Sequence, residues 1–152
     1  MFERTKNKIL SREERETIAR VIEEIEKQTS AEVRVGIRWK RKFTERHLPL
    51  PELALKEFYF LEMDKTGMRT GVFFFFLIAE KQFRIILDET INKQIDQAIL
   101  QQTESTLAAC FQNNNFYISL KSALQILEPA LSSQFPILHN DVNELSNEVS
   151  IR

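Results

Sequence analysis

Residues 72–78 have the sequence VFFFFLI, an uninterrupted apolar run. Side chains of a strand point alternately to its two faces, so a strand that is apolar throughout must be covered on both faces. This stretch therefore predicts a central strand between two layers, with its phenylalanines in the core. The run is much shorter than the ~20 residues that a helix needs to cross a bilayer, so the sequence predicts no transmembrane segment.

The segments on either side of this run predict two more strands. Residues 32–39 alternate between apolar and polar side chains, which is typical of a half-buried strand. A predicted helix over residues 52–61 lies between the two strands, and a crossover of this kind makes them parallel. Residues 83–87 follow the central run closely enough to pair with it as an antiparallel hairpin. The predicted fold is a three-layer α/β/α sandwich around a small mixed sheet.

Helical periodicity surrounds these strands. A capping box at residues 11–14 predicts a helix with one apolar stripe. Thr90 is expected to cap one long helix, and a last helix over residues 117–131 is expected to kink or break at Pro129. The predicted domain covers residues 1–136, and residues 137–152 form an irregular extension. Val142, Leu145 and Val149 are apolar residues in that extension, and we expect them to pack on the domain or on a partner.

Composition narrows the class of protein. The chain has 152 residues, 43% of them hydrophobic and 28% charged, which suits one globular domain. The net charge of −1 argues against a protein that binds nucleic acid. Cys110 is the only cysteine, so no intramolecular disulfide is expected, and the charged N-terminal residues do not resemble a secretion signal. These features predict a cytoplasmic location.

Carboxylates are expected to gather at one end of the sheet. Glu32 begins the first strand, Asp64 and Arg69 precede the second, and Asp88 follows the third, so this topology puts all four at the same end. Asn92 could join them from the next helix. Oxygen ligands of this kind suit Ca²⁺ or Mg²⁺, and an arginine can hold a phosphate. The alternative is an ordinary solvated rim of ion pairs and helix caps.

Other catalytic schemes find little support. His47 and His139 are the only histidines, and neither is placed to activate a nucleophile. The residues that follow Cys110 include no arginine to hold a phosphate, so they do not resemble a phosphatase loop. Residues 64–67 resemble the phosphorylated-aspartate motif of P-type ATPases, but they follow a predicted helix end rather than a buried strand. Residues 38–43 interleave basic and aromatic side chains, which can bind an anionic surface but also suit a solvated loop.

Several segments in this order resemble the TPM-domain family. They are residues 31–35, the helix ending at Leu61, residues 64–72, residues 83–86 and residues 88–92. The resemblance spans residues 10–136, and the tail resembles a short soluble branch of the family. It implies an α/β/α sandwich. Family members include a thylakoid-lumen acid phosphatase and accessory proteins of membrane assemblies. The family often has glycines after the third strand, where this sequence has Glu89 and Thr90.

Three functions follow as hypotheses. The first is an accessory or interaction domain without assignable catalytic machinery, which binds a protein partner in a membrane-associated assembly. The alternative is a phosphomonoesterase that uses Ca²⁺ or Mg²⁺, with Glu32, Asp64 and Asp88 as ligands and Arg69 on the phosphate. The third is a surface-binding module that acts through residues 38–43.

Overall fold

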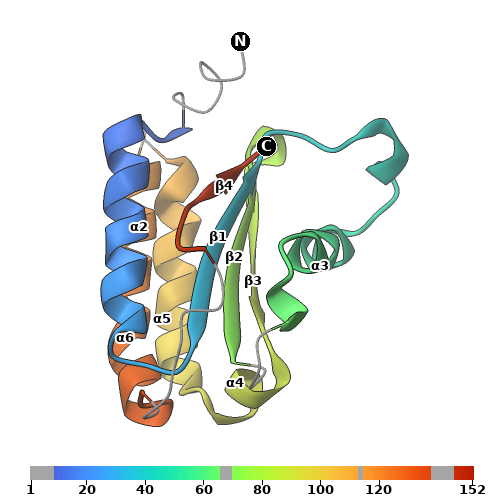
Figure 1. The fold of residues 1–152 in the computed structure, drawn as a ribbon. Helices are drawn as coiled ribbons and strands as arrows, with labels where there is room; N and C mark the ends of the chain where they lie inside the picture. The colour runs from blue at the N-terminus through green and yellow to red at the C-terminus, as the bar shows by residue number, and fades with distance from the viewer. Residues whose placement is uncertain (1–8, 66–69, 113–114, 138–145) are drawn as a thin grey trace.

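A mixed four-stranded sheet forms the centre of the computed structural model, which describes residues 9–65, 70–112, 115–137 and 146–152 (Figure 1). The strands are β1 (Glu32–Arg38), β2 (Gly71–Leu77), β3 (Gln82–Leu87) and β4 (Ser150–Ile151), in the spatial order β3-β2-β1-β4. β1 is parallel to β2 and to β4, and β2 is antiparallel to β3. The predicted arrangement of the first three strands is confirmed.

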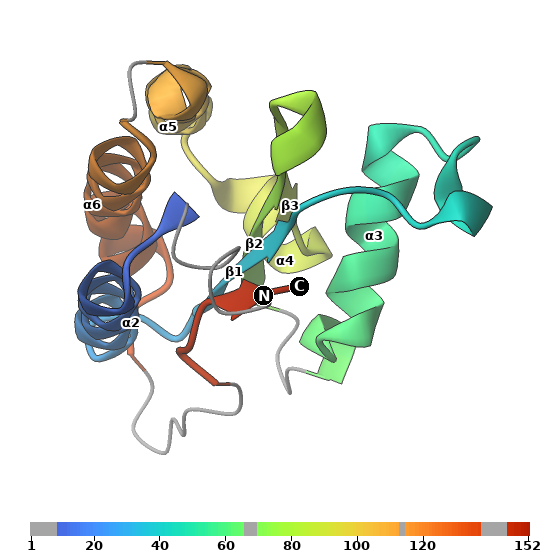
Figure 2. The same cartoon turned by 90° about the horizontal axis from the view of Figure 1, so that it is seen from above.

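Helices cover both faces of this sheet. One face carries α2 (Arg12–Glu26), α5 (Gln97–Ala108) and α6 (Phe116–Gln134), and the other carries α3 (Leu50–Phe60), as Figures 1 and 2 show. The short helix α4 (Glu89–Gln94) follows β3 at the end of the sheet. This is the predicted α/β/α sandwich. None of the described helices is long and apolar enough to cross a membrane.

The central strand separates two cores. All seven residues of β2 are buried. Phe74 and Phe76 pack into the larger core beneath α2, α5 and α6, whereas Phe73 and Phe75 pack into the smaller core beneath α3. The alternation of side chains along a strand explains why consecutive phenylalanines serve both cores. Gly36 of β1 makes room for one of them, since a Cβ at this position would lie 2.8 Å from the Phe73 ring.

The helices after β3 differ from the sequence expectation. Asp88, and not Thr90, caps α4, and the single long helix is two helices. The chain is extended at Ile95, and the Asp96 side chain accepts a hydrogen bond from the Ala98 N–H to begin α5. α6 continues through Pro129 to Gln134, so the expected break is absent. Buried leucines on both sides of the proline hold this helix on the core: Leu120, Leu124, Leu127 and Leu131.

The end of the described chain joins the sheet, although the sequence indicated an irregular extension. Ser150 and Ile151 form β4, and the Arg152 main chain continues the pairing through hydrogen bonds with Ile37 and Trp39. Val149 packs against the larger core, as expected for an apolar anchor. Val142 and Leu145 lie outside the described residues.

Candidate functional site

The acidic end of the sheet has the geometry that the topology predicts. Glu32 is the register partner of Gly71, and the Asp88 N–H donates a hydrogen bond to the Gly71 carbonyl oxygen at 3.1 Å. Glu32 and Asp88 therefore lie at the same end of the sheet. Asp64 lies in the short 3-10 helix Met63–Lys65, which precedes β2.

Asp88 uses both carboxylate oxygens on the main chain. Its Oδ1 accepts a hydrogen bond from the Ile91 N–H at 3.3 Å, which caps α4, and its Oδ2 accepts one from the Gly71 N–H. Carboxylates at a helix N-terminus are stabilised by the helix dipole and by these amides. Asp88 thus joins β2, β3 and α4, a structural role that suffices to explain a carboxylate at this position.

A small groove adjoins Asp88. Its volume is about 210 Å³, and it is lined by apolar side chains of α3 and β3 together with three carboxylates, those of Asp64, Asp88 and Glu89. Glu89 also forms an ion pair with Lys93 at 2.9 Å. Among the residues that the structure describes, no group of three or more carboxylate, imidazole or thiol side chains could hold a metal ion. The metal site remains a prediction.

Glu32 and Asn92, two further predicted site residues, do not line this groove. Asn92 lines a different groove, along β3. Arg69 lies outside the described residues. Glu32 is 6% exposed and contacts Glu26, a residue that the sequence interpretation missed.

Glu26 and Glu32 form a carboxyl pair where α2 meets β1. Burial, together with the hydrogen bond and the negative charge of Glu32, raises the pKa of Glu26 to about 9, so Glu26 holds a proton at neutral pH. Its Oε2 accepts a hydrogen bond from the Val33 N–H at 2.8 Å. Glu26 lies four residues after Ile22 on the buried stripe of α2, and an acidic residue at a core-facing position was the available sequence signal.

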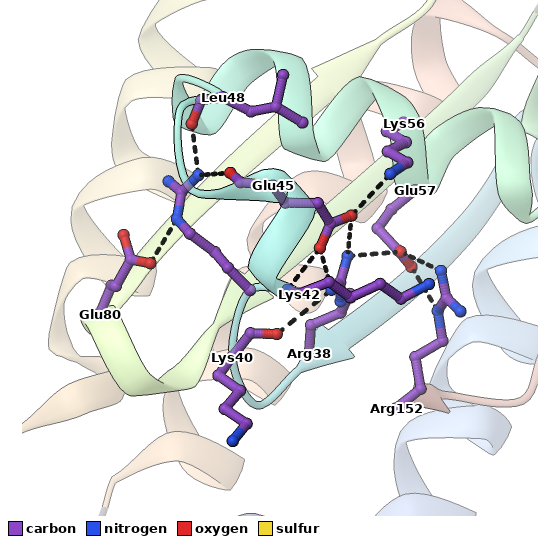
Figure 3. A network of polar contacts seen from close by, with 10 residues as sticks. Arg38, Lys40, Lys42, Glu45, Leu48, Lys56, Glu57, Glu80 and Arg152 are labelled. Atoms are coloured by element: carbon purple, nitrogen blue, oxygen red, sulfur yellow. Dashed lines mark hydrogen bonds and ion pairs between the residues drawn. The ribbon is translucent and has the colours of Figure 1, made fainter.

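A buried ionic network lies at the opposite end of β1 (Figure 3). Arg38 is 3% exposed, and its guanidinium donates hydrogen bonds to the carboxylates of Glu45 and Glu57, which are 0% and 1% exposed. Lys56 contacts Glu45 at 2.9 Å, and Arg152 donates to Glu57 at 2.5 and 3.2 Å. The Arg38 hydrogen bond is the main cause that holds the pKa of Glu45 well below its usual range.

This network accounts for part of the basic segment over residues 38–43. Arg38 is committed to the buried carboxylates, and Arg41 bonds Glu80 and the carbonyl oxygens of Glu45 and Leu48 (Figure 3). Lys40, Lys42 and Phe43 remain exposed. Two of the four cations in this segment therefore stabilise the fold, which weakens the hypothesis of an anionic-surface site.

The single thiol is not placed for nucleophilic chemistry. Cys110 is 2% exposed, and burial raises its pKa to about 12. A thiolate is the nucleophilic form of cysteine, so this residue stays unreactive at neutral pH. His47 is exposed, and His139 lies outside the described residues.

Comparisons with known proteins place the chain among its relatives. The family model of the TPM domain matches residues 4–129. The solution NMR structure of the BA42 protein from the psychrophilic bacterium Bizionia argentinensis is similar in fold, with a TM-score of 0.81 and 28% sequence identity. The similarity covers 92% of this chain and 93% of the BA42 chain. No curated protein sequence matches.

Proposed function

The chain belongs to the TPM-domain family, and we propose that it is an interaction domain that binds a protein partner rather than converting a substrate. The partner that we propose is a component of a membrane-associated assembly, because the TPM-domain family includes accessory proteins of such assemblies. The proposal treats the acidic end of the sheet as a structural joint, because both oxygens of Asp88 already accept main-chain hydrogen bonds.

The observation that carries this proposal is the outer face of α3. Its inner residues are buried in the smaller core, whereas Leu55, Tyr59 and Phe60 are 41%, 55% and 57% exposed. Aromatic side chains bury a large area at a low entropy cost and are enriched at protein interfaces. An aromatic helix face of this kind supports a role in binding, since exposed apolar groups that gather on one element favour a partner.

Site-specific photo-crosslinking tests this proposal. A photoreactive phenylalanine analogue replaces Tyr59 in one variant and Glu24 in a matched control on α2, where the side chain is also well exposed. We expect one protein to cross-link through position 59 and not through position 24, and the purified partner to lose affinity for a Leu55→Asp variant. Equal cross-linking at both positions, or none at position 59, would contradict the proposal.

The phosphomonoesterase is kept as a second candidate, because Asp64, Asp88 and Glu89 line one groove. Ca²⁺ or Mg²⁺ held by Asp64 and Asp88, with Arg69 on the phosphate, would supply a metal-bound water as nucleophile. The assay is hydrolysis of 4-nitrophenyl phosphate with each metal, by the natural protein, by Asp64→Asn and by a Glu24→Gln control. Hydrolysis that only Asp64→Asn removes would replace the interaction proposal with this one.

A further inference from the structure

We infer that the outer edge of β3 docks an extended segment of a partner protein, which adds a strand to the sheet and sets an acidic side chain against Arg84. The inference rests on the proposed function, which it sharpens by naming the surface and the chemistry of the partner. It arises from three features of the described residues: free main-chain groups on β3, a groove along them, and an arginine without an ion pair.

The main-chain groups of β3 are available on one side. In an antiparallel pair, the hydrogen-bonding groups of alternate residues point toward the partner strand and away from it. The Asp88 N–H donates a hydrogen bond to the carbonyl oxygen of Gly71 in β2. The main-chain N–H and C=O groups of Arg84 and Ile86, four and two residues earlier, therefore also face β2. Those of Phe83, Ile85 and Leu87 point outward, and within the described part of the chain they bond no other segment. Such an edge is a template for another strand.

A groove follows this edge. Its volume is about 630 Å³, with β3 as its floor, Pro51 and Leu55 of α3 on one side and Leu100 and Glu104 of α5 on the other. Figure 2 shows α3 and α5 on opposite sides of the sheet at its β3 end. An added strand would therefore lie between two helical walls, with its side chains pointing alternately toward each wall.

The positive charge of Arg84 indicates which kind of partner segment would pair with β3. Arg84 is exposed on the α3 side of β3, where its register partner Phe75 faces the smaller core, and the described residues offer it no hydrogen bond or ion pair. Ile85, its neighbour, faces the larger core on the α5 side. Opposite charges on adjacent strands attract and like charges repel. The edge therefore suits an extended segment in which an aspartate or glutamate, facing Arg84, lies between apolar residues that face α5.

A second copy of the chain fits less well. β3 itself, Gln82–Leu87, has no carboxylate that could face Arg84, and antiparallel pairing centred on position 84 would set the two Arg84 side chains opposite each other, which is unfavourable. Sedimentation of the purified chain tests this occupant directly. A dimer whose interface includes β3 would overturn the inference of a separate acidic partner.

The test uses a phage-displayed library of 12-residue peptides, selected on the purified domain and mapped by amide chemical shifts. We expect selected peptides to perturb the amides of Phe83, Ile85 and Leu87 and to share an acidic residue flanked by apolar ones. An Arg84→Glu variant should weaken the best peptide by at least roughly fivefold, whereas Arg20→Glu, which makes the same charge change on α2, should leave its affinity unchanged. Selection of peptides that avoid β3 would overturn the inference.

Peptide N-methylation tests the strand pairing without altering the protein. Methyl groups on the alternate amides that face β3 remove hydrogen-bond donors, whereas methyl groups on the other amides point to solvent. We expect the first set to abolish measurable binding and the second to retain it. Equal effects of both sets would exclude strand addition. If the cross-linked partner binds Arg84→Glu with full affinity, this inference fails while the proposed function stands.

Discussion

The two edges of the sheet differ in how their main-chain groups are satisfied. At the β1 edge, β4 pairs with Gly36 and Ile37, and the Glu26 carboxyl group accepts the hydrogen bond of the Val33 N–H further along. At the β3 edge, the outward groups of Phe83, Ile85 and Leu87 bond no other described segment. The chain therefore covers the outer side of β1 with the two-residue β4 and the Glu26 carboxyl group, which we call the closed edge, and leaves the outer side of β3 open.

This difference between the two edges indicates that the fold uses one edge for stability and the other for binding. The closed edge carries the buried ions of Arg38, Glu45 and Glu57, and Arg152, which follows β4, contacts Glu57 from the outer side. Side chains along the β3 edge are half-buried or exposed and include no comparable network. Substitutions at the first edge should thus act on stability, and those at the second should act on binding.

The largest effect is expected from Arg38→Met, which opens the network at the closed edge. This change leaves the buried carboxylates of Glu45 and Glu57 without their central cation, and loss of one partner from such a network costs about 3–5 kcal/mol. Urea denaturation measures the loss. Arg84→Met, at the open edge, is the matched control and should change stability by less than about 0.5 kcal/mol. Equal losses of stability in Arg38→Met and Arg84→Met would contradict the assignment of stability to one edge and binding to the other.

A smaller effect is expected from Arg152→Ala, which loosens the attachment of β4. Arg152 bonds Glu57 and stacks on the Phe60 ring at 3.6 Å, and its side chain is 28% exposed. We expect a loss of about 1–2 kcal/mol. Arg152→Lys should lose roughly half as much, because lysine keeps the charge without the paired geometry. A stability unchanged in Arg152→Ala would show that the main chain alone holds β4.

The pH dependence of stability tests the second contact that covers the outer side of β1, the hydrogen bond from the Val33 N–H to the Glu26 carboxyl group. The folded protein keeps a proton on Glu26 up to about pH 9, whereas the unfolded chain releases it near the ordinary value of 4.5. Stability should therefore fall as the pH rises between these values. Glu26→Gln removes this slope, so it should be more stable than the natural protein at pH 8, by a margin that widens as the pH rises from about 5 to 9. The exposed Glu24→Gln serves as control; parallel curves for all three proteins would contradict the assignment.

Sequence patterns predicted the sheet because its strands have strong signals. The continuous apolar run of β2 follows directly from burial on both faces. Alternation correctly predicted that β1 is a strand, but the expectation of a half-buried strand was wrong, because Glu32 and Arg38 on its polar face are 6% and 3% exposed. β4 was missed because two residues carry no periodicity, and its pairing depends on contacts far apart in the chain. The boundary between α4 and α5 was missed because Asp96 resembles an ordinary polar residue within a helix.

The candidate site was predictable only at the level of strand ends. Topology correctly put Glu32 and Asp88 at one end, but it could not show that Asn92 lines the groove along β3 or that Glu32 contacts Glu26. These contacts depend on the direction in which each side chain points, and this direction cannot be predicted from the spacing of residues along the chain. The same limit applies to Arg38, whose place in a basic segment gave no sign of its burial between two carboxylates.

Residue-resolved amide hydrogen exchange compares the two edges in one experiment. The Trp39 N–H bonds the Arg152 carbonyl oxygen at the closed edge, whereas the Ile85 N–H points outward from β3. In the free protein, Trp39 should exchange slowly and Ile85 nearly as fast as in an unfolded chain. A selected peptide should slow exchange at Ile85 and leave Trp39 unchanged. Slow exchange at Ile85 before any peptide is added would show that this edge is already closed and contradict its role in docking.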